Sequence, residues 1–415
     1  MYILNYVNDY DEEQSKLRWA IHDSKTELVH QMIKNNAKLK NHVLHISARL
    51  GNIAILKHYI LAGIDVNKRG LRKDKGFTPL QRAVSRNQFE AVKLLIEAGA
   101  KVNPEFVNLR VCKENCSILN LAVSSGPNLA ILKLLLGNNA NANQSCGKCY
   151  SPLVKAIHDH QEEIVKVLLE AGADVNLRCN DADDEITPLH MAVKQNQTEI
   201  VRILLAKNAN INSVTTYRRE TVLHSAIQVF VGPKVVKCVL NAGIDVNLVD
   251  CNNRTVLELA VTKNTKSTEV IKEHLVKMKA AGLFLGDKNL KAIDGKDFEE
   301  FFELCCKEVE VMKNLKIKHT IVTVYDLMIK KEQDTALRIK FSENCGGILD
   351  FKEKFPVYWD IIEYKFKRVL VRQKRLKKVN YFLDHVFWNI LPTCFVWSIL
   401  EYVEEDFVEE LFNKL

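Results

Sequence analysis

Two pairs of cysteines are the strongest candidates for chemistry in this sequence. Cys112 and Cys116 are separated by three residues, and Cys146 and Cys149 by two. Four thiolates can hold a zinc ion tetrahedrally, so the two pairs could form a metal site shared by two loops. The alternative is a set of small, partly buried thiols. The wide spacing of the first pair favours that alternative, as does the separation of about 10 Å between packed helical layers. We therefore predict no metal and no other cofactor.

Enzymatic chemistry has little support elsewhere in the chain. The sequence contains no Ser-His-Asp order, no glycine-rich phosphate loop, no His-Glu-x-x-His and no paired-carboxylate motif. Three histidines, His45, His190 and His224, stand at similar places in a recurring pattern. We predict that the protein is not an enzyme.

The recurring pattern is clearest from Ile186 to Asn212. Thr187 can cap a helix, and Pro188 already has a helical φ and lacks the amide hydrogen that a first-turn residue would leave unpaired. An inward stripe then predicts a short first helix, a polar turn follows, and a second apolar set predicts a second helix that ends at Asn208. Each repeat is therefore expected to be a helix, a turn, a helix and an extended loop, which we call the finger.

Eight repeats can be numbered by the leucine of the first helix. These are Leu17, Leu44, Leu80, Leu119, Leu153, Leu189, Leu223 and Leu257. Alanine or serine stands three positions after each leucine, which predicts close approach between neighbouring helix pairs. Glycine or asparagine ends the second helix in repeats 1 to 7, as a left-handed closing residue would require, whereas repeat 8 is irregular at that position. Six fingers then begin with Asp-Val-Asn or a close variant, whose asparagine can brace the finger.

This pattern resembles the ankyrin repeat, with the Thr-Pro-Leu-His opening best matched at Thr187 to His190. The resemblance covers Leu17 to Leu285 and implies an all-α ankyrin-repeat solenoid of about eight helix-turn-helix units with hairpin fingers, followed by a small C-terminal helical domain. It also implies that the recurring histidines bridge loop backbone groups. The short first repeat is expected to be a polar cap. We expect domains at 1–285, 286–387 and 388–415.

Composition is that of an ordinary globular protein, with 47% hydrophobic and 27% charged residues among 415. The start lacks the pattern of a secretory signal, and the longest uncharged run is too short to span a bilayer. Eleven cysteines without such a signal predict reduced thiols and a cytoplasmic or nuclear location. We expect no membrane partner.

The net charge of +8 is carried by the repeats, and part of it lies in the finger after Asn67. That finger is either a solvated tip or a docking patch for an acidic target protein, and we assign target binding to it and to the concave face. No aromatic residues interleave with its charges, so we expect no nucleic-acid partner. The basic residues of the finger are Lys68, Arg69, Arg72, Lys73 and Lys75.

Beyond Leu285, helical spacing predicts helices within Asp297–Leu315, Ile321–Lys330, Tyr358–Leu370 and Leu376–Phe387. The basic stretch Lys365–Lys378 is either a nuclear-import signal or the exposed face of a helix, and its interspersed valines and leucines favour the helix.

The final segment resembles a truncated F-box. An ankyrin array that ends in a Leu-Pro and Ile-Leu-x-Tyr element is similar to the PRANC proteins of poxviruses, parasitoid wasps and their endosymbionts. Cys394 and Phe395 depart from the acidic-aliphatic pair usual in that family. The resemblance implies that this segment binds a Skp-type adaptor and, through it, a cullin. The residues that carry this role are Leu391, Pro392, Ile399, Leu400 and Val403.

Two functions follow from these features. In the first, the protein is a substrate receptor: its repeats hold a target protein and its C-terminus delivers that target to an SCF-type cullin ubiquitin ligase. In the second, it is a non-catalytic ankyrin binder that inhibits a signalling protein, as NF-κB inhibitors do, without recruiting a ligase. The sequence does not name the target, because the repeat framework specifies the scaffold while variable surface residues choose the partner.

Overall fold

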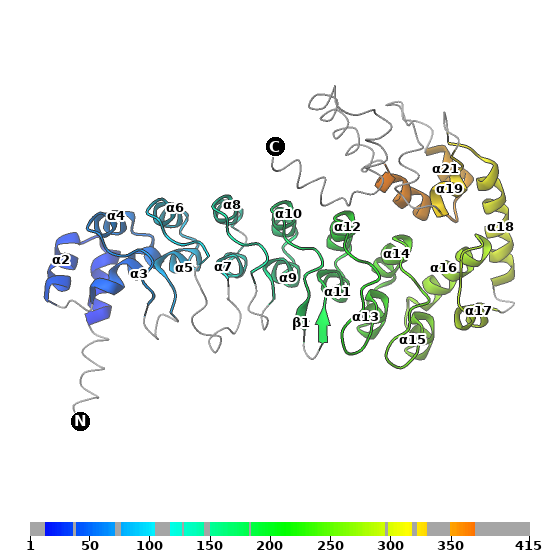
Figure 1. Ribbon diagram of the computed structural model, residues 1–415, viewed down its shortest axis with the longest axis horizontal. Coiled ribbons are helices and arrows are strands. Elements are labelled where there is room, and N and C mark those ends of the chain that lie inside the picture. The colour runs from blue at the N-terminus through cyan, green and yellow to red at the C-terminus, as the bar shows by residue number, and fades with distance from the viewer. Residues whose placement is uncertain are drawn as a thin grey trace, which may run out of the picture. The chain divides into compact units, whose positions relative to one another are not determined.

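The computed structural model describes residues 13–35, 39–70, 76–103, 117–126, 128–144, 150–181, 184–294, 298–317, 322–329 and 349–369. They fall into two compact units, an N-terminal unit, Met1–Ala226, and a C-terminal unit, Ile227–Leu415. Regular structure in the described ranges is almost entirely helical (Figure 1). The prediction of an all-α fold built from helix-turn-helix repeats is therefore confirmed.

The N-terminal unit contains the first six repeats. Repeat 1 consists of a helix at residues 13–22 and α2. In the repeats that follow, the first helix spans six to eleven residues and the second spans nine. The helices are α2 (Thr26–Asn35), α3 (Lys40–Leu50), α4 (Ile53–Leu61), α5 (Pro79–Val84), α6 (Phe89–Glu97), α7 (Ile118–Ser124), α8 (Leu129–Gly137), α9 (Pro152–His158), α10 (Glu162–Glu170), α11 (Pro188–Lys194) and α12 (Thr198–Ala206).

These helices form two parallel rows (Figure 1). First helices contact first helices, in the order α3, α5, α7, α9 and α11, and second helices contact second helices, in the order α4, α6, α8, α10 and α12. The small residue three positions after each repeat leucine is buried, as predicted, and Ala192 is fully inaccessible. Close packing between repeats therefore depends on side chains no larger than serine at this position.

Local sequence determines where the helices begin and end. Thr187 is extended, its hydroxyl accepts the His190 N–H at 3.4 Å, and Pro188 follows at the first helical position. The closing residues Gly63, Gly99, Asn139, Gly172, Asn208 and Gly243 all have positive φ, which confirms the predicted left-handed ends in repeats 2 to 7. Asn36, the expected closing residue of repeat 1, lies outside the described residues.

One of the predicted hairpin fingers contains a two-stranded antiparallel sheet. Strands β1 (Cys179–Asp181) and β2 (Asp184–Ile186) pair in the finger between α10 and α11, with Cys179 opposite Ile186. The next finger has a single bridge between Val214 and Thr221. Both fingers are therefore antiparallel hairpins, the first with a short ladder and the second with one bridge.

The seventh repeat begins with α13 (Val222–Gln228), which contains the boundary between the two compact units. The C-terminal unit continues with α14, α15 and α16, and α14 packs on α16. Its remaining elements are α17, α18, α19, α21 and a helix at residues 359–369. The bounds are α14 (Pro233–Asn241), α15 (Val256–Thr262), α16 (Thr268–Ala280), α17 (Asp287–Ile293), α18 (Glu299–Asn314), α19 (Val324–Ile329) and α21 (Leu349–Lys354).

Repeat 8 is closed by Gly282, with φ of 68°, a closing residue that the sequence analysis did not identify. Helix α16 has thirteen residues where α14 has nine, so the glycine is displaced from its expected position. After it, α17 contacts α15 and α16, and α18 contacts α16. A short helix and a longer one thus follow repeat 8 and pack on it as a further pair would, while the domain boundary expected at Leu285 stays a prediction.

The helices predicted beyond Leu285 are observed where the chain is described. Helix α18 buries Cys305, Val309 and Met312 at helical spacing. Residues 324–329 and 359–369 are helical as well, near their expected positions. The fourth expected helix, Leu376–Phe387, lies outside the described residues, and so does the basic stretch after Val369.

Candidate protein-binding surface

Asparagines in the fingers tie each repeat to the next. The side-chain amide of Asn143 donates to the carbonyl oxygen of Gly172 at 3.3 Å, and its oxygen accepts from the N–H of Asp174 at 2.7 Å. Asn67 and Asn103 make the same two bonds to the repeats that follow them. We call each of these pairs an asparagine bracket. The asparagine of the Asp-Val-Asn motif was expected to brace its own finger, but the residue two positions before it does so. Asp174, for example, accepts the N–H of Asn176.

The recurring histidines join a first helix to the finger that precedes the next repeat. His190 Nε2 donates to the carbonyl oxygen of Glu220 at 3.2 Å, while Nδ1 lies 2.8 Å from the Thr187 hydroxyl. His45 Nε2 reaches the carbonyl oxygen of Phe77 at 3.0 Å in the same manner. Burial, with the charges of Arg178 and Lys194, lowers the pKa of His190 to about 4, so the imidazole is neutral at ordinary pH. The structural role expected from the resemblance is confirmed for His45 and His190.

A buried carboxylate joins the fingers that precede α11 and α13. Asp184 accepts the backbone N–H of Tyr217 at 2.9 Å and that of Arg218 at 3.2 Å, an arrangement we call the Asp184 clamp. Burial alone raises the pKa of Asp184, but hydrogen bonds from Tyr217, Thr215, Arg218 and Glu185 together bring it below its usual value. The clamp fixes the backbone of the second finger at its tip.

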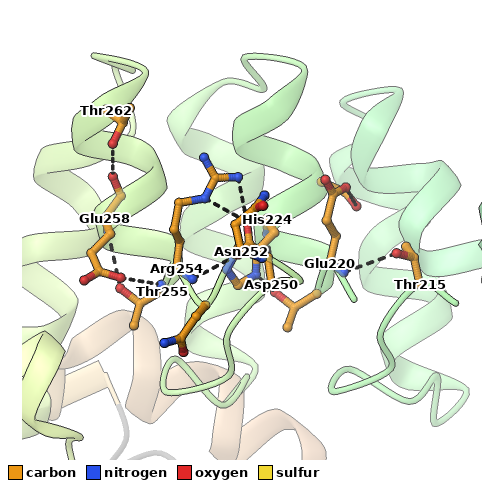
Figure 2. Close-up of polar contacts among 12 residues, drawn as sticks. Thr215, Glu220, His224, Asp250, Asn252, Arg254, Thr255, Glu258 and Thr262 are labelled. Carbon is orange, nitrogen blue, oxygen red and sulfur yellow. Dashed lines mark hydrogen bonds and ion pairs between the residues drawn. The ribbon is translucent and has the colours of Figure 1, made fainter. Parts of the chain in front are cut away.

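Arg178 reinforces the same pair of fingers. Its guanidinium donates to the carbonyl oxygen of Val214 at 2.9 Å, and the Thr216 hydroxyl donates to a carboxylate oxygen of Glu185 at 3.0 Å. At the base of the second finger, the Thr215 hydroxyl accepts the N–H of Glu220 at 3.2 Å (Figure 2). A finger held at tip and base presents its exposed side chains at a low entropic cost.

The exposed side chains on this finger suit protein recognition. Tyr217 is 71% exposed, and Arg218 and Arg219 beside it are exposed too. Arg219 has φ of 52°, an uncommon conformation for arginine that the surrounding bonds hold in place. Tyrosine and arginine dominate the binding energy of many interfaces. The sequence analysis missed this site, although an aromatic residue followed by two arginines in a finger was a usable signal.

The basic finger predicted to bind the target is described only in part. Lys68 is exposed, whereas Arg69 is half-buried and donates to the carbonyl oxygen of Gly76 at 3.3 Å. Arg69 therefore helps to close its own finger. Arg72, Lys73 and Lys75 lie outside the described residues. Target binding by this finger stays a prediction.

In the C-terminal unit, an ion pair closes the finger before α15 (Figure 2). Asp250 accepts from Arg254 Nη2 at 2.7 Å and from Nε at 3.0 Å, and also accepts the N–H groups of Asn252 and Arg254. Burial raises the pKa of Asp250, but these bonds outweigh it and lower the pKa overall. Thr255 then caps α15, with Glu258 bonded back to the Thr255 N–H at 2.7 Å.

The chain that leads toward the C-terminus is anchored to α16. The buried Tyr358 hydroxyl donates to the carbonyl oxygen of Lys277 at 2.8 Å, and Lys277 Nζ donates to the carbonyl oxygen of Val357 at 2.7 Å. From α18, Glu308 accepts the N–H groups of Val357 and Tyr358 where the helix at residues 359–369 begins. Burial raises the pKa of Glu308. Three separate side chains thus hold the start of this helix.

Several predicted site residues lie outside the described residues. They include both cysteine pairs and the adaptor-binding set Leu391, Pro392, Ile399, Leu400 and Val403. In the described part of the chain, no three His, Cys, Asp or Glu side chains converge as they would around a metal ion. There too, no helix is long and apolar enough to cross a membrane.

The helix pairs are stacked in two rows and linked through asparagine brackets, and serine or threonine caps the first helices α5, α7, α9, α11 and α15. These features define a repeat scaffold that binds other proteins. The sequence profile of ankyrin repeats matches residues 17–106, 119–215 and 177–250. The chain belongs to the ankyrin repeat family, whose members are in general non-enzymatic modules for protein interaction.

Relatives occur in viruses. The ankyrin repeat protein FPV031 of fowlpox virus is 25% identical over 387 residues, which cover 88% of this chain and 90% of the relative. Protein R598 of Acanthamoeba polyphaga mimivirus is 30% identical over 136 residues, which cover 33% of this chain and 38% of the relative. Among solved structures, the ankyrin repeat domain of Bcl-3, a member of the IkappaB family, is 25% identical with a TM-score of 0.45, over 55% of this chain and 97% of that one.

Proposed function

We propose that the protein is a substrate receptor that links a target protein to an SCF-type cullin ubiquitin ligase. The observation that carries the proposal is the fowlpox relative, which matches 88% of the chain, more than the repeats at 1–285 could account for. The shared architecture therefore includes sequence beyond the repeats. The resemblance of the C-terminal segment to a truncated F-box supplies the adaptor function.

Target binding is assigned to the fingers and the concave face. Lys68 is the exposed residue of the basic finger in the described part of the chain, and Tyr217, Arg218 and Arg219 add a second exposed group. Both groups suit an acidic partner, because opposite charges speed association and arginine binds carboxylates in a bidentate manner. The chain itself carries out no reaction in this proposal.

The anchoring of the helix at residues 359–369 supports the delivery step. Tyr358, Lys277 and Glu308 fix this part of the chain to repeat 8 and to α18. An adaptor bound at the C-terminus would be tethered to repeat 8 through this helix. Such tethering raises the effective concentration of ligase at a captured target.

The proposal is tested by replacing two leucines of the F-box-like segment, Leu391→Ala with Leu400→Ala. We expect the intact protein to co-purify with a recombinant Skp-type adaptor and cullin, and the double variant to lose them. A buried leucine contributes roughly 1.5 to 3 kcal/mol by area, so two truncations suffice. Leu61→Ala, at a 78% exposed leucine of α4, is the matched control and should keep the adaptor.

Circular dichroism separates lost binding from lost folding, since the double variant should keep the helical signal of the repeats. Retention of the adaptor by the double variant would contradict the assignment of these leucines. Absence of the adaptor from the intact protein would leave the second function, an ankyrin binder that inhibits its target without a ligase.

A further inference from the structure

The turn between the two helices of repeat 7 differs from the same turn in every other repeat. Seven residues after each repeat leucine, the chain takes a left-handed conformation, at Ser24, Gly51, Asn87, Gly126, His160, Asn196, Phe230 and Asn264. Seven of these residues are polar or glycine, which tolerate a positive φ at low cost. Phe230 has φ of 56° and is the one large apolar residue in the series.

Phe230 also exposes its ring. The side chain is 63% exposed, although an aromatic ring gains more from burial than almost any other side chain. The turn itself is regular, because the Phe230 N–H donates to the carbonyl oxygen of Ile227 at 3.2 Å, just as the Asn196 N–H donates to that of Val193 at 2.9 Å. The turn therefore forms in the same way with asparagine or phenylalanine, and it does not require the exposed ring. A strained backbone that carries an exposed ring points to a function outside the fold.

A second departure lies in repeat 8. Four residues after the repeat leucine, the apolar side chain is fully buried in repeats 1 to 7, whereas Val261 at this position in repeat 8 is 54% exposed. Val229, next to Phe230, is also exposed. The two turns are neighbours, since Lys263 Nζ lies 5.7 Å from the centre of the Phe230 ring and the Ser267 hydroxyl donates to the carbonyl oxygen of Val231 at 3.2 Å.

The charged side chains of the two turns are lysines, and Glu269, which follows them directly in the sequence, is paired with Lys272 at 3.1 Å. Residues 229–236 and 261–268 contain Lys234, Lys263 and Lys266 and no acidic residue. A partner that covers the patch would therefore need an apolar side chain for Phe230 and Val261 and carboxylates for the lysines. The position of Lys263 over the ring adds a cation–π contact that keeps the ammonium group at the edge of the patch.

We infer that Val229, Phe230, Val261 and Lys263 form a second docking surface, separate from the fingers, for an acidic segment of a partner protein with an aromatic or aliphatic anchor. This surface lies on the helix-helix turns of repeats 7 and 8. It is independent of the proposed ligase function, because it uses neither the fingers nor the C-terminal segment.

The inference is tested on the full chain with a labelled peptide in which one tryptophan is flanked by aspartate and glutamate. The matched probe replaces these with asparagine and glutamine. We expect the acidic peptide to bind, with an affinity that falls as salt rises, and the neutral probe to bind at least about tenfold more weakly. Fluorescence anisotropy measures both.

Phe230→Asn is the decisive variant, because asparagine already occupies this turn position in repeats 3, 6 and 8. We expect at least about a tenfold loss of affinity for the acidic peptide. The thermal midpoint should stay the same or rise, since asparagine adopts a positive φ more easily than phenylalanine. Trp19→Asn is the control, because Trp19 is an exposed aromatic residue of repeat 1 with Lys25 Nζ 3.7 Å from its ring centre and lies outside both proposed surfaces; it should leave peptide binding unchanged.

Three results would overturn the inference. One is an affinity for the acidic peptide that Phe230→Asn leaves intact, and another is equal binding of the two peptides. The third is a dimer of the free protein in sedimentation that disappears in Phe230→Asn, which would make a second copy of the chain the occupant. Failure of the proposed ligase function would leave all these measurements unchanged, because they use no adaptor.

Discussion

Replacing Asp184 with asparagine should weaken the finger that carries Tyr217. The side chain is only 9% exposed and accepts three backbone N–H groups, from Glu185 at 2.9 Å, Tyr217 at 2.9 Å and Arg218 at 3.2 Å. Asparagine has nearly the same shape but offers one acceptor oxygen and one donor nitrogen. At least one N–H of the Asp184 clamp would then face another donor.

The size of the effect follows from the charge on the acceptor. A hydrogen bond to a charged group contributes about 1.5 to 3 kcal/mol, and an unpaired buried donor costs a similar amount. We therefore expect Asp184→Asn to destabilise the closed finger by about 2 to 3 kcal/mol. Local opening should increase by roughly thirtyfold or more, since 1.4 kcal/mol corresponds to a factor of ten.

The effect should depend on pH in a defined direction. The pKa of Asp184 is lower in the folded protein than its usual value, so its stabilising contribution is fully present above the unfolded pKa of about 3.9 and is lost as pH falls through the lower folded pKa. The difference between wild type and Asp184→Asn should be constant from about pH 7 to pH 5 and shrink below about pH 4.

Hydrogen exchange at the Tyr217 and Arg218 amides measures this opening directly. Asp174→Asn is the matched control, because Asp174 accepts one N–H in its finger and Asn141 and Asn210 already do so at the equivalent positions. That control should exchange like wild type. If the Tyr217 and Arg218 amides of Asp184→Asn also exchanged at the wild-type rate, the Asp184 clamp would contribute nothing to the stability of this finger, and the prediction would be wrong.

Two further predictions concern the packing between repeats. Ala192→Leu should lower the free energy of unfolding, measured in urea, by about 1 to 3 kcal/mol, because Ala192 is fully buried between repeats. Ala206→Leu, at the exposed end of α12, is the control and should change little. Equal urea midpoints for the two variants would contradict the repeat register. His190 has its pKa lowered to about 4, so its imidazole should stay neutral until the pH falls to about 4. The unfolded chain takes up this proton near pH 6.5, so the free energy of unfolding should fall by up to about 3 kcal/mol between about pH 6.5 and 4. An imidazole that titrates near 6.5 by NMR would contradict this.

Much of the fold could be predicted because short sequence patterns within each repeat determine its helices and turns. Each of these patterns acts over a few residues, so it can be recognised in the sequence. Examples are the cap Thr187, the small residue Ala192 and the left-handed helix end Asn208. Repetition of the pattern then fixes which surfaces face each other. The displaced closing glycine, Gly282, was missed because four extra helical residues break the period.

The candidate site was harder to predict because its contacts join residues of different fingers. Asp184 lies 33 positions before Tyr217, and no local pattern indicates that the Asp184 carboxylate accepts the Tyr217 backbone N–H. Glu308 is similar, since it sits in a helix rich in exposed glutamates and only tertiary packing buries it. Phe230 was visible in the sequence, but its importance depends on a backbone angle that the sequence does not state.

The asparagine brackets bear on how such a chain can gain or lose repeats. Asn67, Asn103 and Asn143 bind backbone atoms at the same two positions of the following repeat, so a copied repeat would find its junction chemistry already present on both sides. Asn247 instead binds Phe284 and Gly286, two positions later relative to the closing glycine. A repeat inserted after repeat 8 would meet a mismatched junction. Duplication should therefore lengthen the array from within, while its last junction stays fixed.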